Sequence, residues 1–146
     1  MVFEYPTFEE CIQIHDKIIQ ISGGKVGEIN LGELEKVLVF VQSNVYYPNF
    51  LDKASYLAYS INKNHAFMDG NKRSSIAISE MFLYKNGYEY VLPYFAKKME
   101  DVAVGVADNI ISKDELHGFI DNILNDVDFS EAQKIQLIRV KNISSL

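Results

Sequence analysis

The sequence has little cysteine, which excludes two common ways of stabilising a small protein. Its 146 residues include a single cysteine, Cys11. A lone thiol cannot form an internal disulfide, and no cysteine cluster has the spacing of a structural zinc site. Cys11 falls on the apolar side of the first expected helix, and this placement predicts simple packing in the core.

Positive charge is also scarce. The chain has 14 Lys and Arg against 20 Asp and Glu, which gives a net charge of −6 and an isoelectric point near 5.0. Because no basic face dominates, the sequence predicts no direct binding to nucleic acid. Lys72 and Arg73 are adjacent, however, and they could still create a small cationic pocket on an acidic protein.

Long apolar runs are absent, and none approaches the roughly 20 residues of a membrane-spanning helix. The N-terminal stretch MVFEYPTFEE is acidic and lacks the basic-then-apolar order of a signal peptide. We therefore expect a cytoplasmic protein with no membrane partner. Apolar residues make up 48% of the chain and no linker or repeat interrupts it, so residues 1–146 are expected to form one domain.

What the sequence does contain is a succession of helix signals. Thr7 with Glu10 and Ser112 with Glu115 have the spacing of capping boxes. Apolar residues recur every three or four positions between such signals. Helices are expected at 7–23, 30–41, 51–64, 71–86, 94–110, 112–123 and from 130 onward. These patterns predict an all-α fold, a compact bundle of six or seven helices with a short flap hairpin near VYYPNF.

The most informative segment is HAFMDGNKR, residues 65–73, at the start of the fourth expected helix. A helix N-terminus attracts phosphate through its unpaired backbone N–H groups and the positive end of its dipole. Gly70 permits a tight turn and close approach of an anion. Asn71 can donate its amide, Lys72 adds a point charge, and Arg73 offers a fork suited to bidentate phosphate contact.

Three other residues of this segment have separate predicted roles. Asp69 would repel an anion directly, so we expect it to hold a divalent cation, Mg²⁺, that bridges phosphate oxygens. His65 can take a proton from an attacking hydroxyl near neutral pH. Phe67 is apolar between polar neighbours, and it is expected to anchor the loop in the core.

The residues alone leave a second interpretation of the segment open. Asp-Gly is common in ordinary turns, and a histidine at a helix end is often a cap or a solvated residue. Against this, Lys72 and Arg73 oppose the helix dipole, and charge placed against local preference is typical of functional sites. His15 and His117 have no partner at ligand spacing, so they are predicted to be surface or half-buried residues without a catalytic role.

The segment resembles the signature of the Fic/Doc family, H-x-F-x-D/N-A/G-N-K/G-R. The stretches GEINLGELEKVL and YPNFLDKASYLAYSINKNHAF before it are similar to the Doc branch, as are MFLYKNGYEY and VAVGVADNIISKDELHGFI after it. The resemblance covers about residues 5–125, which leaves 126–146 as an expected C-terminal extension. Its specified positions are filled by His65, Phe67, Asp69, Gly70, Asn71, Lys72 and Arg73.

The resemblance implies an activity. Fic proteins are α-helical domains that transfer part of a nucleotide, most often AMP from ATP, to a protein hydroxyl. Most have glycine where this chain has Lys72, and in the Doc branch the lysine goes with a nucleotide bound in the reverse direction. The implied protein is a toxin that uses ATP and Mg²⁺ to phosphorylate a threonine of elongation factor Tu. His65, Asp69 and Arg73 would be catalytic, Asp69 would bind the metal, and residues 70–73 would bind phosphate.

The resemblance also implies a partner. Many Fic proteins carry an inhibitory helix of the form S/T-x-x-x-E-G/N, but Thr7 here is followed by Cys11 at the glutamate position and Ser112 by Leu116. A separate antitoxin protein is therefore expected. Two alternatives stay open: transfer of AMP to a protein hydroxyl, and an antitoxin-binding module whose catalytic site is vestigial.

Fic domains carry a flap before the motif that aligns the target peptide by main-chain pairing. QSNVYYPNF, residues 42–50, stands where such a flap is expected. Val45, Tyr46 and Tyr47 suit a strand with a free edge, and they are predicted to bind the target. The alternative is a structural loop whose tyrosines pack on the surface.

Overall fold

The computed structural model describes residues 2–27 and 30–144, and it confirms the all-α prediction. These residues form seven α-helices, one short 3-10 helix and no β-strand. Two short ranges lie outside the described part. They are residues 28–29, within the stretch GEINLGELEKVL, and residues 145–146, at the end of the expected extension. The elements are α1 (Phe8–Ser22), α2 (Leu31–Phe40), α3 (Phe50–Lys63), α4 (Asn71–Lys85), η1 (Glu89–Val91), α5 (Leu92–Ala107), α6 (Lys113–Leu124) and α7 (Glu131–Ser144).

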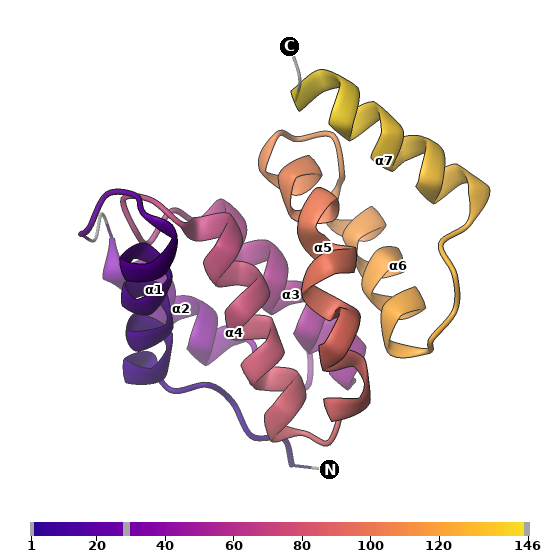
Figure 1. Cartoon of the computed structure of the whole chain (residues 1–146). Coiled ribbons are helices and arrows are strands. Elements are labelled where there is room, and N and C mark those ends of the chain that lie inside the picture. The colour runs from indigo at the N-terminus through magenta and orange to yellow at the C-terminus, as the bar shows by residue number, and fades with distance from the viewer. Residues whose placement is uncertain (1, 28–29, 145–146) are drawn as a thin grey trace.

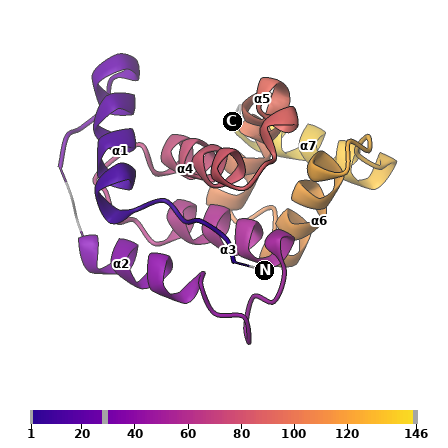
Figure 2. The same ribbon diagram turned by 90° about the horizontal axis from the view of Figure 1, so that it is seen from below.

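Helices α3 and α4 lie side by side at the centre of the bundle (Figure 1). Helices α1 and α2 lie on one side of this pair, and α5, α6 and α7 lie on the other (Figure 2). The loop of residues 64–70 joins the two central helices, and it buries Ala66 and Phe67 while His65 and Met68 are exposed. The buried faces of the central pair carry Ala54, Leu57, Ala58, Ile61, Ile78, Phe82 and Leu83.

Most helices begin where the sequence indicates. Thr7 and Ser112 form capping boxes, in which the side chain accepts a hydrogen bond from the backbone N–H three residues on. Asn30 precedes α2, but its side chain makes no capping hydrogen bond. Asn49, which the sequence analysis did not identify, caps α3. Cys11 is buried as expected, and burial raises the pKa of its thiol to about 12.

The predicted flap hairpin in residues 42–50 is wrong. The segment between α2 and α3 forms turns, and the backbone N–H of Tyr47 donates to the carbonyl of Ser43 at 3.0 Å. The buried Lys53 gives the physical reason. Its Nζ donates to the carbonyls of Val41 (3.0 Å) and Ser43 (3.4 Å), so these groups are held by an ammonium and not by strand pairing.

The described part of the expected extension packs on the bundle. Val140 of α7 is buried, and it lies against α5 at Gly105. A Cβ at Gly105 would come within 2.6 Å of the Ile111 side chain and 2.8 Å of Val140. Glycine inside this helix therefore allows α7 to approach α5 closely. No helix in the described ranges combines the length and apolar character needed to cross a membrane.

Candidate active site

The segment HAFMDGNKR occupies the passage from the end of α3 to the start of α4. Gly70 is the N-cap of α4 with φ +79°, a left-handed conformation that favours glycine. A cavity of about 230 Å³ lies beside it and contains six of the seven signature residues in its wall, all except Phe67. The lining consists of His65 and residues 68–73, together with Asn62, Lys63 and Ala107.

Phe67 turns away from the cavity into the core, where it is 1% exposed. Asn71 Nδ2 donates to the Phe67 carbonyl at 3.0 Å, and the Phe67 N–H donates to Asn71 Oδ1 at 3.3 Å. These two hydrogen bonds close the loop onto the first turn of α4. The structure thus gives the Asn71 amide a loop-closing role that the sequence did not indicate, and its contact with phosphate stays a prediction.

The carboxylate of Asp69 is held in one orientation beside the cavity. The Gly70 N–H donates to Oδ1 at 2.8 Å and the Lys25 N–H donates to Oδ2 at 3.2 Å. These two hydrogen bonds hold the pKa of the Asp69 carboxyl below its usual value, and the one from Gly70 has the larger effect. The nearby charges of Arg73 and Lys72 lower this pKa further. Asp69 is therefore an oriented anion at neutral pH.

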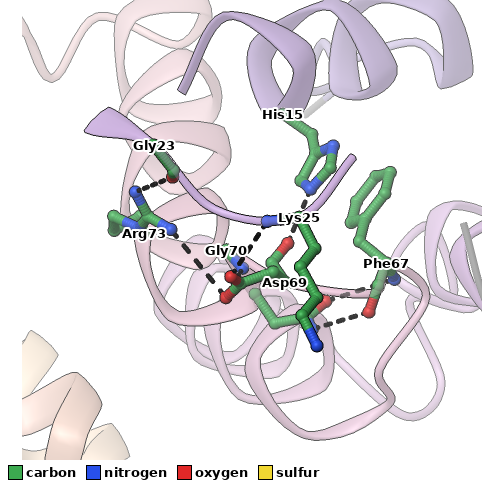
Figure 3. A network of polar contacts seen from close by, with 8 residues as sticks. His15, Gly23, Lys25, Phe67, Asp69, Gly70 and Arg73 are labelled. Atoms are coloured by element: carbon green, nitrogen blue, oxygen red, sulfur yellow. Dashed lines mark hydrogen bonds and ion pairs between the residues drawn. The ribbon is translucent and has the colours of Figure 1, made fainter. Parts of the chain in front are cut away.

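A segment that the sequence analysis did not connect with the motif lies directly over it. We call residues 23–27 the strap; the contacts of its Gly23 and Lys25 are drawn in Figure 3. Arg73 Nη1 donates to the Gly23 carbonyl at 3.1 Å. The Met68 N–H donates to the Gly27 carbonyl at 3.0 Å. The strap therefore holds the motif on both sides of Asp69 through its own main-chain carbonyl groups.

The glycines of the strap are the sequence signal that could have located it. Gly23, Gly24 and Gly27 stand within five residues, whereas the sequence analysis places only the end of the first expected helix there, at residue 23. Gly24 has φ +125°, and a Cβ there would lie 2.8 Å from Asp69 Oδ2. Glycine at this position is thus required both by the backbone and by the closeness of the carboxylate.

The prediction that His15 is a surface or half-buried residue is wrong, because its side chain is only 1% exposed. Its ring stacks on Phe67 with centroids 3.7 Å apart and planes 6° from parallel. Its Nε2 lies 2.6 Å from the carbonyl oxygen of Asp69. A signal was present, since Cys11, His15 and Ile19 are spaced by four residues and form the buried face of α1.

The two remaining groups of the site face solvent. His65 is exposed and has φ +49°, a left-handed conformation unusual for a residue with a side chain. Lys72 is exposed and also lines the cavity. Across residues 2–27 and 30–144, neither side chain forms a hydrogen bond or an ion pair. Both are therefore available to a bound molecule.

The structure does not bring Val45, Tyr46 and Tyr47 to the motif. These residues precede α3, whereas the motif follows it. The 14 residues of α3 separate the two regions by about 20 Å, because an α-helix rises about 1.5 Å per residue. The two tyrosines line a different cavity, on the far end of α3. The segment that lies on the motif by main-chain contact is the strap.

Comparison with known proteins agrees with this geometry. A family model described as the Fic/DOC family matches residues 5–83, which include α1, the strap and the motif. A protein named toxin Doc from Mycolicibacterium smegmatis is 34% identical over 105 residues, covering 66% of this chain and 81% of that protein. Protein kinase doc of Escherichia phage P1 is 32% identical over 108 residues, covering 71% and 82% respectively. The chain described here is a member of the Fic/DOC family.

Proposed function

We propose that this protein is a Doc-like toxin that transfers the γ-phosphate of ATP to a hydroxyl of a translation factor resembling elongation factor Tu. The observation that carries the proposal is Lys72, whose exposed side chain lines the motif cavity next to Arg73. The Fic/Doc signature allows either lysine or glycine at this position. The name of the phage relative, protein kinase doc, points to the same reaction for that protein.

The first turn of α4 supplies the phosphate site in this proposal. The first N–H groups of a helix have no partner within the helix, and the dipole adds positive potential. Lys72 and Arg73 add two cations to the same turn. Arg73 is already held by the Gly23 carbonyl and lies 3.9 Å from Asp69. Its guanidinium is therefore oriented before any ligand arrives.

His65 is the proposed proton acceptor. The oxygen of the target hydroxyl attacks the γ-phosphorus, and the bond from that phosphorus to the oxygen bridging it to the β-phosphate breaks. ADP leaves, and the hydroxyl proton moves to the His65 imidazole. The absence of any hydrogen-bond partner for this ring in the described residues leaves a nitrogen free to accept it. The cationic turn stabilises the charge that develops on the transferred group.

Asp69 fits the Mg²⁺ ion that this chemistry requires. Mg²⁺ is usually held by one or two carboxylates together with phosphate oxygens and water. Asp69 provides one such carboxylate, ionised and oriented by Gly70 and Lys25, and each of its oxygens retains a further lone pair. When bound, the ion would neutralise charge on the phosphates. Asp69 itself would hold the ion at the wall of the cavity.

A mass measurement tests which group is transferred. The protein is incubated with ATP, Mg²⁺ and a purified bacterial elongation factor Tu, and the factor is then weighed and mapped by peptide. A phosphoryl increment that is absent with His65→Ala is the expected result. An adenylyl increment would replace this proposal with AMP transfer, the alternative that the family resemblance leaves open.

Toxicity provides a second test, in living bacteria. We expect controlled expression of the wild-type chain to arrest growth, and His65→Ala expressed to the same level to allow it. The proposal includes a separate antitoxin chain, since the sequence contains no inhibitory helix of its own. Equal growth arrest by His65→Ala would favour the binding-module alternative, in which the site is vestigial.

A further inference from the structure

His15 is the one histidine buried beneath the motif, and the mechanism above does not use it. Its ring comes from α1, fifty-four positions before the carbonyl that it contacts. One face is stacked on Phe67, with the ring centroids 3.7 Å apart, and Nε2 lies 2.6 Å from the Asp69 carbonyl oxygen (Figure 3). A buried ring that contacts two motif residues by two different interactions is well suited to hold that loop.

The direction of the hydrogen bond determines where the proton of the ring lies. A carbonyl oxygen only accepts hydrogen bonds, so Nε2 of His15 must carry a hydrogen and donate to Asp69. The other nitrogen, Nδ1, faces the carboxylate of Asp16 at 3.5 Å. The polar groups that the structure places around the ring are thus a backbone carbonyl on one side and a largely exposed carboxylate on the other.

The carbonyl that His15 contacts belongs to the peptide group joining Asp69 to Gly70. The N–H of that same peptide group donates to Asp69 Oδ1 at 2.8 Å. One peptide plane is therefore held at both ends, by the imidazole and by the carboxylate. Rotation of this plane would move the Asp69 carboxylate and the left-handed Gly70 N-cap of α4 together.

We propose that His15 is a positioning residue, which fixes this peptide plane and thereby the metal-binding carboxylate and the phosphate-binding turn. The effect of His15 on catalysis rests on the proposed function, whereas its role in holding the loop does not depend on that function. His15 is not one of the residues that line the cavity, so it acts through Asp69 and Gly70, which do line it. Without its hydrogen bond, the loop would sample orientations in which Asp69 and α4 are no longer aligned.

Two substitutions separate the ring from the hydrogen bond. His15→Phe keeps an aromatic face for Phe67 but removes the donor, and His15→Gln keeps a donor but removes the aromatic stack. We expect His15→Phe to lower kcat for transfer by about 10- to 100-fold, with a smaller change in KM for ATP, because small misplacements near a reacting centre have effects of this size. His15→Gln should recover part of the loss. The control is His117→Phe in α6, beside the N-terminal end of α3, which should leave kcat and KM as in wild type.

Amide hydrogen exchange tests the positioning without any nucleotide. In His15→Phe, the Gly70 and Lys25 N–H groups, which both donate to Asp69, should exchange faster than in wild type, while amides in the middle of α6 should not change. Unchanged exchange at both, or wild-type kcat in both His15 variants, would overturn the proposal. If His15→Phe exchanges faster but the wild-type protein transfers nothing from ATP, the proposed function is refuted and the positioning role of His15 is not.

Nitrogen NMR of the wild-type protein covers the case in which the variants do not fold. Labelled His15 should show a hydrogen on Nε2, coupled across the hydrogen bond to the Asp69 carbonyl. A ring protonated only on Nδ1 would overturn the proposal, because that form cannot donate to Asp69.

Discussion

The cavities at the two ends of helix α3 are lined by similar residues in different arrangements. Its C-terminal end leads to a cavity of about 230 Å³ with His65, Asp69 and Lys72 in the wall. Its N-terminal end borders a cavity of about 220 Å³ with His117, Asp52, Lys113 and three tyrosines in the wall. Each end thus has a histidine, a carboxylate and a lysine around a cavity of nearly equal size.

The difference lies in what these groups already contact. At the N-terminal end, His117 and Asp52 form a 2.9 Å pair, and Lys113 Nζ lies over the rings of Tyr47 and Tyr56 at 5.7 and 5.5 Å. The imidazole, the carboxylate and the ammonium there each already have a partner. At the motif end, the backbone fixes the carboxylate, while the imidazole and the ammonium face the cavity.

This comparison shows that residue types around a cavity do not by themselves make a site. Groups that are paired with one another stabilise the fold, whereas groups that are oriented but left without a partner can act on a ligand. A helix start does not distinguish the two ends either, because the motif cavity borders the first turn of α4 and the other cavity borders the first turns of α3 and α6. Four substitutions test this distinction, and the first three are each paired with a control variant.

The largest effect is expected from the histidines at the two ends. His65→Ala should reduce transfer by about 100- to 10,000-fold, the range expected for loss of a general base, while its thermal melt stays near wild type. His117→Ala should leave transfer unchanged and should lower stability by no more than about 1 kcal/mol, since its pair with Asp52 is partly exposed. Loss of transfer in His117→Ala, or its persistence in His65→Ala, would contradict the comparison.

Phe67→Ala should lower the free energy of unfolding by about 3–5 kcal/mol, because removal of a buried aromatic ring leaves a cavity. The ring is 1% exposed and is stacked on His15. Chemical denaturation provides the measurement. Met68→Ala is the neighbouring control, and its 50% exposed side chain should cost far less. Equal midpoints for these two variants would show that Phe67 does not anchor the loop.

Gly24→Ala and Gly27→Ala test the strap. Both glycines have strongly positive φ, +125° and +121°, so each alanine should cost about 1–3 kcal/mol in backbone strain. Only the Gly24 Cβ would also approach Asp69, at 2.8 Å, whereas nothing lies within 4 Å of a Cβ at Gly27. Gly24→Ala should therefore be the less stable variant and should also lose transfer. The strap has no such role if the two variants behave alike in both assays.

The smallest expected effect is a change in the pH dependence of stability from Asp69→Asn. The folded-state pKa of Asp69 lies below its unfolded value, so ionised Asp69 stabilises the fold above that unfolded value, near 3.8, and the contribution is lost as pH falls through the folded-state pKa. The variant should be less stable than wild type at pH 7, and the gap should narrow as the pH falls below 3.8. Urea denaturation at a series of pH values provides the measurement. A stability difference between variant and wild type that is constant with pH would show that the carboxylate is not held as described.

Much of the fold could be predicted because its signals are local. Capping boxes at Thr7 and Ser112, glycine stops and helical spacing are read within a few residues, and the helices begin and end close to the expected positions. The signature residues were also within reach, since they are contiguous and a helix N-terminus brings them together. The flap hairpin was wrongly predicted because Val45, Tyr46 and Tyr47 favour a strand locally, whereas in the structure Lys53 holds the neighbouring carbonyls in turns.

By itself, the sequence determined the helices and the set of polar groups at the start of α4, because both depend on residues adjacent along the chain. Only the tertiary structure decided what supports those groups. His15 reaches the motif across 54 positions and Lys25 across 44, and no local pattern encodes such contacts. They exist because α1 packs against α4 and delivers an imidazole and a glycine-rich strap to the same carboxylate. The core thereby orients the Asp69 carboxylate that the sequence could only name.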